Sequence, residues 1–391
     1  MAARWSAAFD FVEAGFIHSI PRNDAFPVRL KDVVYKIARA LGVFALVRDS
    51  RWRRNRLLIL CYHGVSVDDE HVWDPALYVT QDKLRQRLQV LRDGAYEILP
   101  LAEATRRLYD GTLPPRSVAI TFDDGAVDFE RRALPVLREF NAPATLYLTT
   151  YYSVRRLPVF NTVLSYVVWK GRGSGGDVAP LCEWPRALPV ATPAERAEAG
   201  TRLREFARRM DLDAEQKNAL VSRVAAALGV DFQDILAREL LHIMPPEVVR
   251  ALPRALVDVQ LHTHRHRTPR DREQFLREIR DNVAIMRELR GDDTVLEHFC
   301  YPSGEYFGEF FEWLRESGVR YATTCIPDLA AQSGDPMLIP RFVDTMGQSD
   351  LAFEAWVTGF AGLLPHRSEY RIDGARLAGA VTLETEVARA R

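Results

Sequence analysis

The chain has 391 residues, 47% of them hydrophobic, which suits one large α/β domain with an insertion. Lysine and arginine (52) balance aspartate and glutamate (53), so there is no global positive field and we expect no nucleic-acid partner. The four cysteines lie far apart without a CxxC pair, which excludes a dense disulfide framework and a zinc knuckle.

Residues 1–50 predict a small helical segment. Its apolar residues recur at helical spacing and would form one stripe: Val33, Val34, Ile37, Leu41 and Phe44. Asp10 and Glu13 interrupt the apolar stretch that a signal peptide needs, and no run of about 18 apolar residues occurs. We therefore expect a cytoplasmic protein without a transmembrane helix.

A local excess of arginine follows, at 48–56, with Trp52 in its middle. Two interpretations stay open for this segment. It is either a solvated linker at the lower rim of the domain or a basic patch in peripheral contact with the inner membrane surface.

From residue 57 onward, short apolar runs alternate with helical patterns. The runs that predict strands are 57–62, 117–122, 144–149, 256–261, 299–301 and 319–323. The patterns that predict helices include 81–91, 128–140 and 272–289, the last with Asp271 as N-cap. This alternation indicates an α/β fold with a parallel sheet.

The alternation breaks at 153–250, where the sequence predicts a helical insertion. Thr192-Pro193-Ala194-Glu195 has the residues of an N-cap, a proline at N1 and a glutamate at N3, and Asp213 can start a second helix. The α/β domain would then consist of 51–152 and 251–346, followed by a helical tail at 347–391.

Polar groups follow three of the predicted strands. Asp123-Asp124-Gly125 follows 117–122, His262 and His266 follow 256–261, and His63 follows the first strand. The carboxyl ends of strands in an α/β barrel open onto one face, so residues far apart in sequence would meet there.

One carboxylate and two imidazoles are a suitable ligand set for a divalent ion, with positions left for water and substrate. The second aspartate could then act as a general base if the two carboxylates point in different directions. We take Zn²⁺ as the first choice. Taken singly, Asp-Asp-Gly is more often a turn and His-x-x-x-His a surface pair.

The segments TFDDG and HTHRH resemble the polysaccharide deacetylase family, the NodB-homology group of carbohydrate esterases. LLILCYHGV and FCYPSGEY resemble further segments of that family, and the resemblance spans about 57–152 and 250–346. It implies a distorted, incomplete (β/α) barrel that removes acetyl groups from N-acetylated sugars. By position it makes Asp123 the base and Asp124, His262 and His266 the metal ligands. It also makes the Ser303 backbone N–H an oxyanion donor.

Three departures from the family pattern concern the substrate side of the site, where we place Tyr301, Pro302, Ser303 and Arg341. Ser303 stands where many members have an aromatic residue. Glu297 stands where some members have an arginine that orients the catalytic aspartate. Arg341 could replace that arginine, or it could form a salt bridge at the barrel rim.

The usual late histidine that acts as general acid has no clear counterpart, because His366 lies in a different context. His63 is the better candidate to protonate the leaving amine, and a structural, hydrogen-bonded role is its alternative. We place His264 outside the ligand set, as a solvent-facing group or one that supports the ligands.

These observations favour a hydrolase that removes N-acetyl groups from an amino-sugar glycan or from its lipid- or nucleotide-linked precursor, as in exopolysaccharide assembly. Two alternatives remain. One is a deformylase or other amidase acting on a lipid-linked amino sugar, and the other is a catalytically silent barrel that binds glycan.

Overall fold

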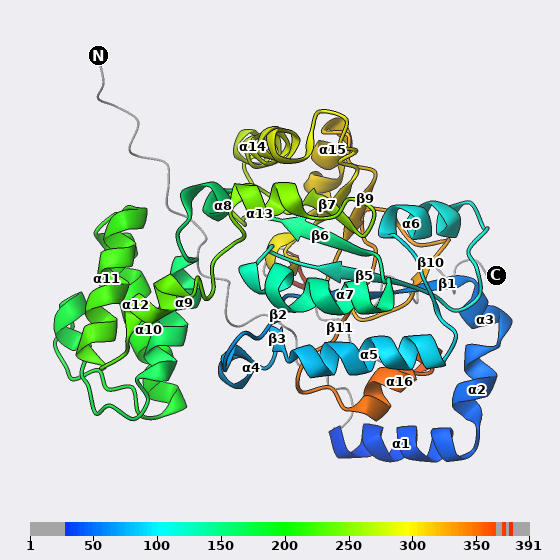
Figure 1. Cartoon of the computed structure of the whole chain (residues 1–391), viewed down its shortest axis with the longest axis horizontal. Coiled ribbons are helices and arrows are strands. Elements are labelled where there is room, and N and C mark those ends of the chain that lie inside the picture. The colour runs from blue at the N-terminus through cyan, green and yellow to red at the C-terminus, as the bar shows by residue number, and fades with distance from the viewer. Residues whose placement is uncertain (1–27, 365–369, 373–374, 378–391) are drawn as a thin grey trace. The chain divides into compact units, whose positions relative to one another are not determined.

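The computed structural model describes residues 28–364, 370–372 and 375–377 (Figure 1). The described chain forms two compact units. One comprises Tyr152–Pro245, and the other comprises the residues before Tyr152 and after Pro245. The sequence predicted an insertion over 153–250.

A curled sheet forms the core of the larger unit, with the strand order β10-β1-β5-β6-β7-β8-β9. β4 adds to β5 and β11 adds to β1, and every pair is parallel except β1 with β10. The strands are β1 (Arg56–Tyr62), β4 (Glu97–Ile98), β5 (Ser117–Phe122), β6 (Ala144–Leu148), β7 (Val257–Leu261), β8 (His298–Cys300), β9 (Tyr321–Thr323), β10 (Ala330–Ala331) and β11 (Phe342–Val343). β2 (Gly64–Val65) and β3 (Tyr78–Val79) form a separate parallel pair. The predicted distorted, incomplete (β/α) barrel is confirmed.

The segment 339–343 bridges the two edges of this curled sheet. Near β9, Thr324 N donates to Ile339 O at 2.9 Å and Arg341 N donates to Ile326 O at 2.8 Å. Directly afterwards the segment becomes β11 and pairs with β1. Arg341 therefore lies where the barrel closes.

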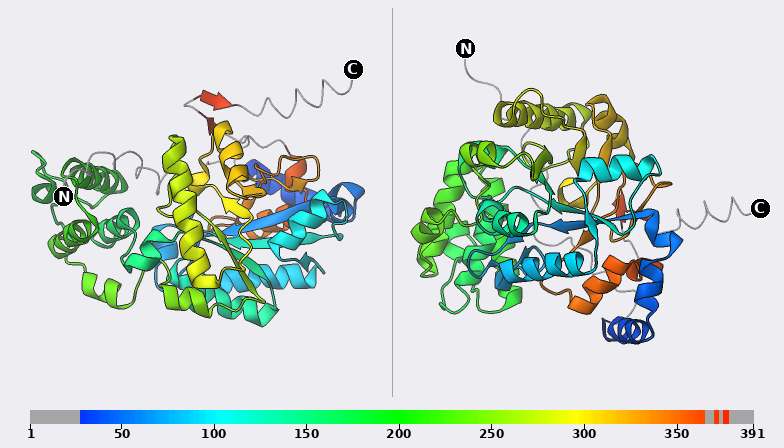
Figure 2. Two further views of the ribbon diagram at one scale, coloured as in Figure 1. Left: turned by 90° about the horizontal axis from the view of Figure 1, so that it is seen from above. Right: turned by 45° about the vertical axis from the view of Figure 1, so that its right-hand side comes forward.

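The larger unit also contains helices, several of which lie along the outer side of the sheet (Figures 1 and 2). Their bounds are α1 (Val28–Ala40), α2 (Val43–Arg48), α3 (Arg51–Arg54), α4 (Glu70–Trp73), α5 (Gln81–Asp93), α6 (Leu101–Tyr109), α7 (Leu134–Phe140), α13 (Pro246–Ala251), α14 (Arg272–Arg290), α15 (Gly308–Glu316) and α16 (Asp350–Thr358). The predicted N-cap is confirmed, since the Asp271 side chain accepts from Gln274 N at 2.9 Å. β1 from Leu57 onward and the whole of β5 are buried, as strands covered on both faces must be.

Two helix predictions need correction. The helix predicted over 128–140 begins with a π-helical turn, Phe129–Ala133, before α7. The helical tail predicted over 347–391 holds for α16, but Tyr370–Ile372 (β12) and Ala375–Leu377 (β13) pair as antiparallel strands. Aromatic and β-branched residues favour strands, and an Asp-Gly dipeptide stands between these two in the sequence, a pattern typical of hairpins.

The smaller unit is helical. Its main helices are α9 (Phe160–Lys170), α10 (Pro193–Arg209), α11 (Ala214–Ala227) and α12 (Phe232–Ala237), with a 3-10 turn at Ala179–Cys182. Helix α8 (Tyr151–Arg155) begins one residue before this unit. Both predicted helix starts are confirmed as reciprocal capping boxes, Thr192 with Glu195 and Asp213 with Gln216.

The predicted N-terminal stripe is divided between two environments. Phe44 is buried, whereas Val33, Ile37 and Leu41 are exposed. The reason is the left-handed turn at Gly42 (φ 73°), which gives α2 a separate start and turns Phe44 toward the barrel unit. No helix among the described residues is long and apolar enough to cross a membrane.

Candidate active site

Asp123 and Asp124 follow β5 and point to different partners. Asp123 N donates to Tyr62 O at 2.9 Å, which extends the parallel ladder by one residue. The chain then turns through left-handed conformations at Asp124 (φ 70°) and Gly125 (φ 86°). A Cβ at position 125 would lie 2.3 Å from Leu148 Cδ1, so the turn requires glycine. This turn separates the directions of two adjacent carboxylates.

Asp124 lies between the two predicted histidine ligands. Its Oδ1 atom is 3.1 Å from His262 Nε2 and 3.1 Å from His266 Nε2. One ligand atom from each of the three residues lies within 4.8 Å of the others. The two histidines reach this point from a turn with left-handed backbone at Thr263 (φ 61°) and His266 (φ 56°), directly after β7.

The hydrogen bonds of His262 suit metal binding. Its Nδ1 donates to the Cys300 carbonyl oxygen at 2.9 Å, so Nε2, beside Asp124 Oδ1, is the ring nitrogen available to an ion. Its backbone N–H donates to Asn282 Oδ1 at 3.1 Å. Asn282 also donates to Leu148 O and Thr150 Oγ1. Sequence reasoning missed Asn282; the signal was a polar residue on the buried face of a helix.

The pKa shifts in this group reflect the close approach of two imidazoles and one carboxylate. Burial raises the pKa of Asp124, but the neighbouring His266 and His262 outweigh it and hold that pKa well below its ordinary value. Burial lowers the pKa of His266, which keeps the ring in the neutral form that binds metals. Burial acts on His262 in the same direction, but Cys300 and Asp124 prevail and raise its pKa. Two imidazoles and a carboxylate around one point fit a catalytic zinc ion.

Asp123 is held by Arg341 rather than by the two histidines that face Asp124. The guanidinium donates from Nη1 to Oδ1 and from Nη2 to Oδ2, each at 2.7 Å. Arg341 also donates to Thr121 Oγ1 and Thr324 O. Burial raises the pKa of Asp123, but Arg341 outweighs it and holds the pKa well below its ordinary value. Asp123 is therefore an ionised carboxylate in a fixed orientation.

This geometry corrects the grouping of Arg341 with the substrate-side residues. Its side chain is 0% exposed, so it can neither form a salt bridge at the rim nor reach a substrate. The physical reason is the closing segment, which directs residue 341 into the barrel. Of the roles considered from sequence, orienting Asp123, the predicted base, is the one that the contacts support.

Three of the four cysteines gather around the same ion pair. Cys61 Sγ lies 3.6 Å and Cys300 Sγ 3.4 Å from Asp123 Oδ2. Cys325 Sγ lies 3.7 Å from Arg341 Nη2. Sequence reasoning missed this cluster because the cysteines are distant in sequence; their positions at or near strand ends were the available signal.

Two other groups of metal-ligating atoms share Asp123, one with Cys61 and His63 and one with His262 and Cys300. In both, a cation would face the guanidinium of Arg341, which occupies both Asp123 oxygens. The group around Asp124 has no such competing charge, so it is the better metal site.

His63 lies beside Asp123, the predicted base. Its Nε2 is 3.8 Å from Asp123 Oδ2, and its side chain is 18% exposed. Its buried Nδ1 has no hydrogen-bond partner among the residues that the structure describes. Nδ1 therefore makes no hydrogen bond of the kind that the structural alternative for His63 would need. His366 lies outside the described residues.

Tyr301 and Pro302, which we placed on the substrate side, are both buried. Tyr301 packs against Phe299 and Tyr306, and its hydroxyl donates to Met337 O at 3.1 Å, so it is a core residue. Ser303 is half-buried and left-handed (φ 57°), at a sharp turn. Within the described residues its backbone N–H has no hydrogen-bond acceptor, as an oxyanion donor requires.

His264 faces neither the metal group nor solvent. It is buried, with Nδ1 2.8 Å from Thr150 Oγ1, and its carbonyl oxygen accepts from Tyr151 N and Thr149 Oγ1. It therefore braces the turn that carries the ligands.

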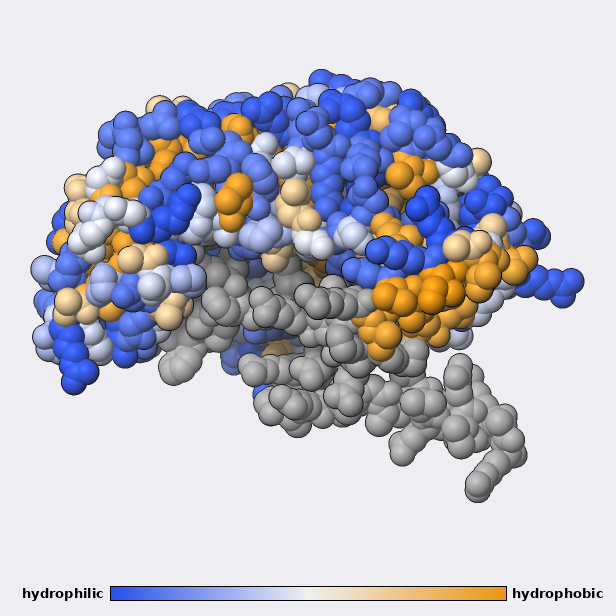
Figure 3. Space-filling view, turned by 90° about the horizontal axis from the view of Figure 1, so that it is seen from below, coloured by the Kyte–Doolittle hydropathy of each residue, from blue (hydrophilic) through white to orange (hydrophobic). Residues whose placement is uncertain are grey.

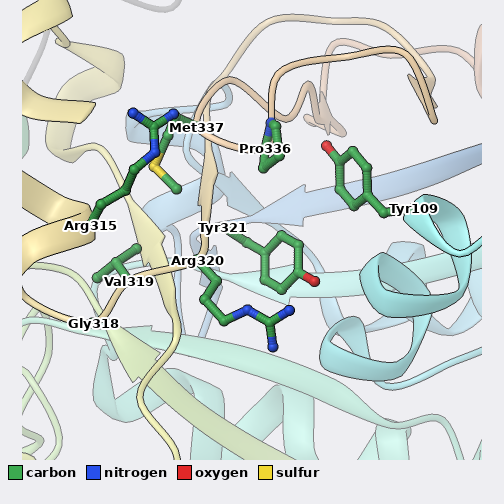
Figure 4. A pocket seen from close by; sticks show the side chains of 8 residues that line it. All are labelled: Tyr109, Arg315, Gly318, Val319, Arg320, Tyr321, Pro336 and Met337. Carbon is green, nitrogen blue, oxygen red and sulfur yellow. The ribbon is translucent and has the colours of Figure 1, made fainter. Parts of the chain in front are cut away.

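A separate hollow of about 550 Å³ lies at the opposite, amino end of β9 (Figure 4). Tyr109 and Tyr321 stack there at 5.8 Å, with Arg315 and Arg320 beside them. Its lining includes none of the predicted site residues. Barrel active sites form at the carboxyl ends of strands, so we do not assign the chemistry to this hollow.

Known proteins match this chain both in sequence and in fold. The family model described as polysaccharide deacetylase matches residues 110–168. The poly-beta-1,6-N-acetyl-D-glucosamine N-deacetylase of Escherichia coli (strain K12) is 30% identical over 101 residues, which are 26% of this chain and 15% of that protein. YxkH of Bacillus subtilis (strain 168), whose name carries the same family, is 32% identical over 94 residues, 24% of this chain and 32% of that protein. The chain thus spans only a small part of each relative.

The fold comparison covers more of the chain. The Streptococcus pyogenes deacetylase PplD, solved in complex with acetate, superposes with a TM-score of 0.51 and 16% identity. The match covers 79% of this chain and 99% of that one. Sequence motifs, the matched segment and the fold thus point to one family, and the chain resembles the polysaccharide deacetylases in all three.

Proposed function

We propose that this protein is a metal-dependent N-deacetylase acting on an N-acetylated amino-sugar glycan or on its lipid- or nucleotide-linked precursor. The observation that carries the proposal is the division of labour between adjacent carboxylates. Asp124 faces two imidazole nitrogens at 3.1 Å each, and Asp123 faces Arg341. The name of the matched Escherichia coli relative supports the substrate class.

Asp124, His262 and His266 would hold one divalent ion, for which zinc is our first choice. When bound, the ion polarises the acyl oxygen and lowers the pKa of a water molecule. Asp123 accepts the proton of the attacking water, since Arg341 takes only part of the hydrogen-bonding capacity of a carboxylate.

Two further groups complete the proposed chemistry. The Ser303 backbone N–H stabilises negative charge on the acyl oxygen, and it has no competing acceptor among the described residues. His63, beside Asp123 and partly exposed, donates a proton to the leaving amine.

The test measures acyl release from N-acetylglucosamine oligomers and from nucleotide-linked and lipid-linked N-acetylated sugars, with zinc-loaded protein. Acetate release by the unmodified protein but not by Asp123→Asn supports the proposal. Formate release from N-formyl analogues alone would favour the deformylase, and no release from any substrate would contradict deacetylation.

A second experiment separates base from ligand. Asp123→Asn keeps the ion and loses about 10²–10⁴-fold in rate, the usual contribution of a general base. Asp124→Asn loses the ion as well, because it removes one of three ligands. Metal content and rate measured together would show the reverse pattern if the two assignments were exchanged.

A further inference from the structure

Helix α1 and Leu41, the residue directly after it, present a line of aliphatic side chains to the outside. Leu30, Val33, Ile37 and Leu41 follow one another at intervals of three or four residues and are 44–72% exposed. Leu46 on α2 is exposed as well. Figure 3, viewed from the side on which α1 lies, shows a continuous apolar band over this helix. We call these five residues the apolar stripe. Contiguous apolar surface of this kind usually marks a contact surface.

The opposite side of α1 is fixed to the barrel unit. Tyr35 packs edge-on against Phe44 at 6.4 Å and against Phe360 at 6.1 Å. Arg39 Nε forms an ion pair with Glu354 at 3.0 Å. Glu354 lies in α16, and Phe360 follows shortly after the end of that helix. The apolar stripe is therefore held outward by a packed helix.

The same part of the chain is strongly basic, although the whole chain has a net charge of −1. Residues 28–56 contain nine lysines and arginines and two aspartates. Lys36, Arg51 and Arg54 are exposed. Lys36 neighbours Ile37 and lies about 100° from it around the helix, so it borders the apolar stripe. From that position its long side chain can reach an anionic headgroup while its methylenes cover apolar surface.

We propose that α1, α2 and α3 dock this protein on an anionic lipid bilayer, with the apolar stripe at the boundary of headgroups and acyl chains. An amphipathic helix with lysine beside its apolar face is suited to lie in that plane. A second copy of the chain suits the surface less well. A symmetric contact would bring the same basic borders together, and like charges oppose association.

The test compares binding of the full chain to two kinds of vesicle, phosphatidylcholine alone and phosphatidylcholine with one quarter phosphatidylglycerol. We expect sedimentation with the anionic vesicles, weakening as salt rises. Ile37→Ser/Leu41→Ser should bind at least about tenfold more weakly, since it removes two exposed aliphatic side chains. Val295→Ser is the matched control, because Val295 is 65% exposed but lies outside the apolar stripe.

The charge contribution is tested separately with Lys36→Glu, which should weaken binding to anionic vesicles about fivefold or more and leave binding to neutral ones unchanged. Acetate release from a soluble substrate should stay the same in all these variants. If the membrane proposal fails, the proposed catalysis is therefore unaffected. The proposal is overturned if the full chain ignores anionic vesicles. It is equally overturned if light scattering shows a dimer that Ile37→Ser/Leu41→Ser dissociates.

Discussion

Replacing Arg341 with methionine is the sharpest test of how the barrel holds Asp123, the proposed base. Arg341 and Asp123 are 0% and 2% exposed and share two hydrogen bonds of 2.7 Å. Methionine fills much of the same space without charge. The substitution therefore leaves Asp123 buried without its main counter-ion.

The expected loss follows from the charges. Burial raises the pKa of Asp123, and Arg341 reverses this and holds the pKa well below its ordinary value. Such a carboxyl stabilises the fold above about pH 4, and that contribution is lost as the pH falls through the folded-state pKa. Without the guanidinium, burial dominates and the pKa rises above the ordinary value. The free energy of unfolding should fall by about 3–5 kcal/mol at neutral pH and by less near pH 4, where Asp123 can take up a proton.

Chemical denaturation at several pH values measures this loss, and the rate profile measures its effect on catalysis. The acid limb of the rate should move to higher pH, since the base is protonated more readily. The double variant Asp123→Asn/Arg341→Met should recover most of the stability but none of the activity, because it removes both buried charges. Unchanged stability and an unmoved acid limb in Arg341→Met would refute the reasoning.

Three further outcomes are expected. His262→Ala should lose the divalent ion in elemental analysis, while His264→Ala should keep it; an ion retained at full stoichiometry by the first variant would contradict the site. His63→Ala should keep the fold and the metal but slow amide hydrolysis more than hydrolysis of an aryl acetate ester, because the leaving group of the ester needs no proton. An equal loss of rate on both substrates would mark His63 as structural. A hydrogen bond from Cys61 and the charge of Arg341 lower the pKa of Cys325 to about 6. Alkylation of Cys325, followed by mass spectrometry, should therefore accelerate as the pH rises through 6 and precede alkylation of the buried thiols.

Local sequence signals were enough to predict the elements of the barrel, because each signal depends on only a few neighbouring residues. Apolar runs gave β1, β5 and β6, and N-capping residues such as Asp271 and Asp213 marked helix starts. The metal group followed from a topological rule, since residues after parallel strands meet at one face. The tail was mispredicted because its two short strands carry a weaker signal than the helix before them.

The arrangement of residues around Asp123, the proposed base, could not be predicted from local sequence, because these residues meet through contacts between distant parts of the chain. Arg341 and Asp123 are 218 residues apart and meet only because the segment 339–343 closes the barrel. Cys61 and Cys300 join them from two other strands. Tyr301 was misplaced for the same reason, because its core contacts with Met337 arise from distant chain.

The two ends of the segment that forms the smaller unit lie close together. Ser153 Oγ donates to Met244 O at 2.6 Å, and Pro158 bridges to His242. Because the ends of the intervening chain are already joined, each doubling of its length would cost only about 0.6 kcal/mol in loop-closure entropy. This position can therefore accept insertions of very different size while the barrel sequence stays the same, so it is a natural place for related chains to diverge and for a foreign domain to be grafted.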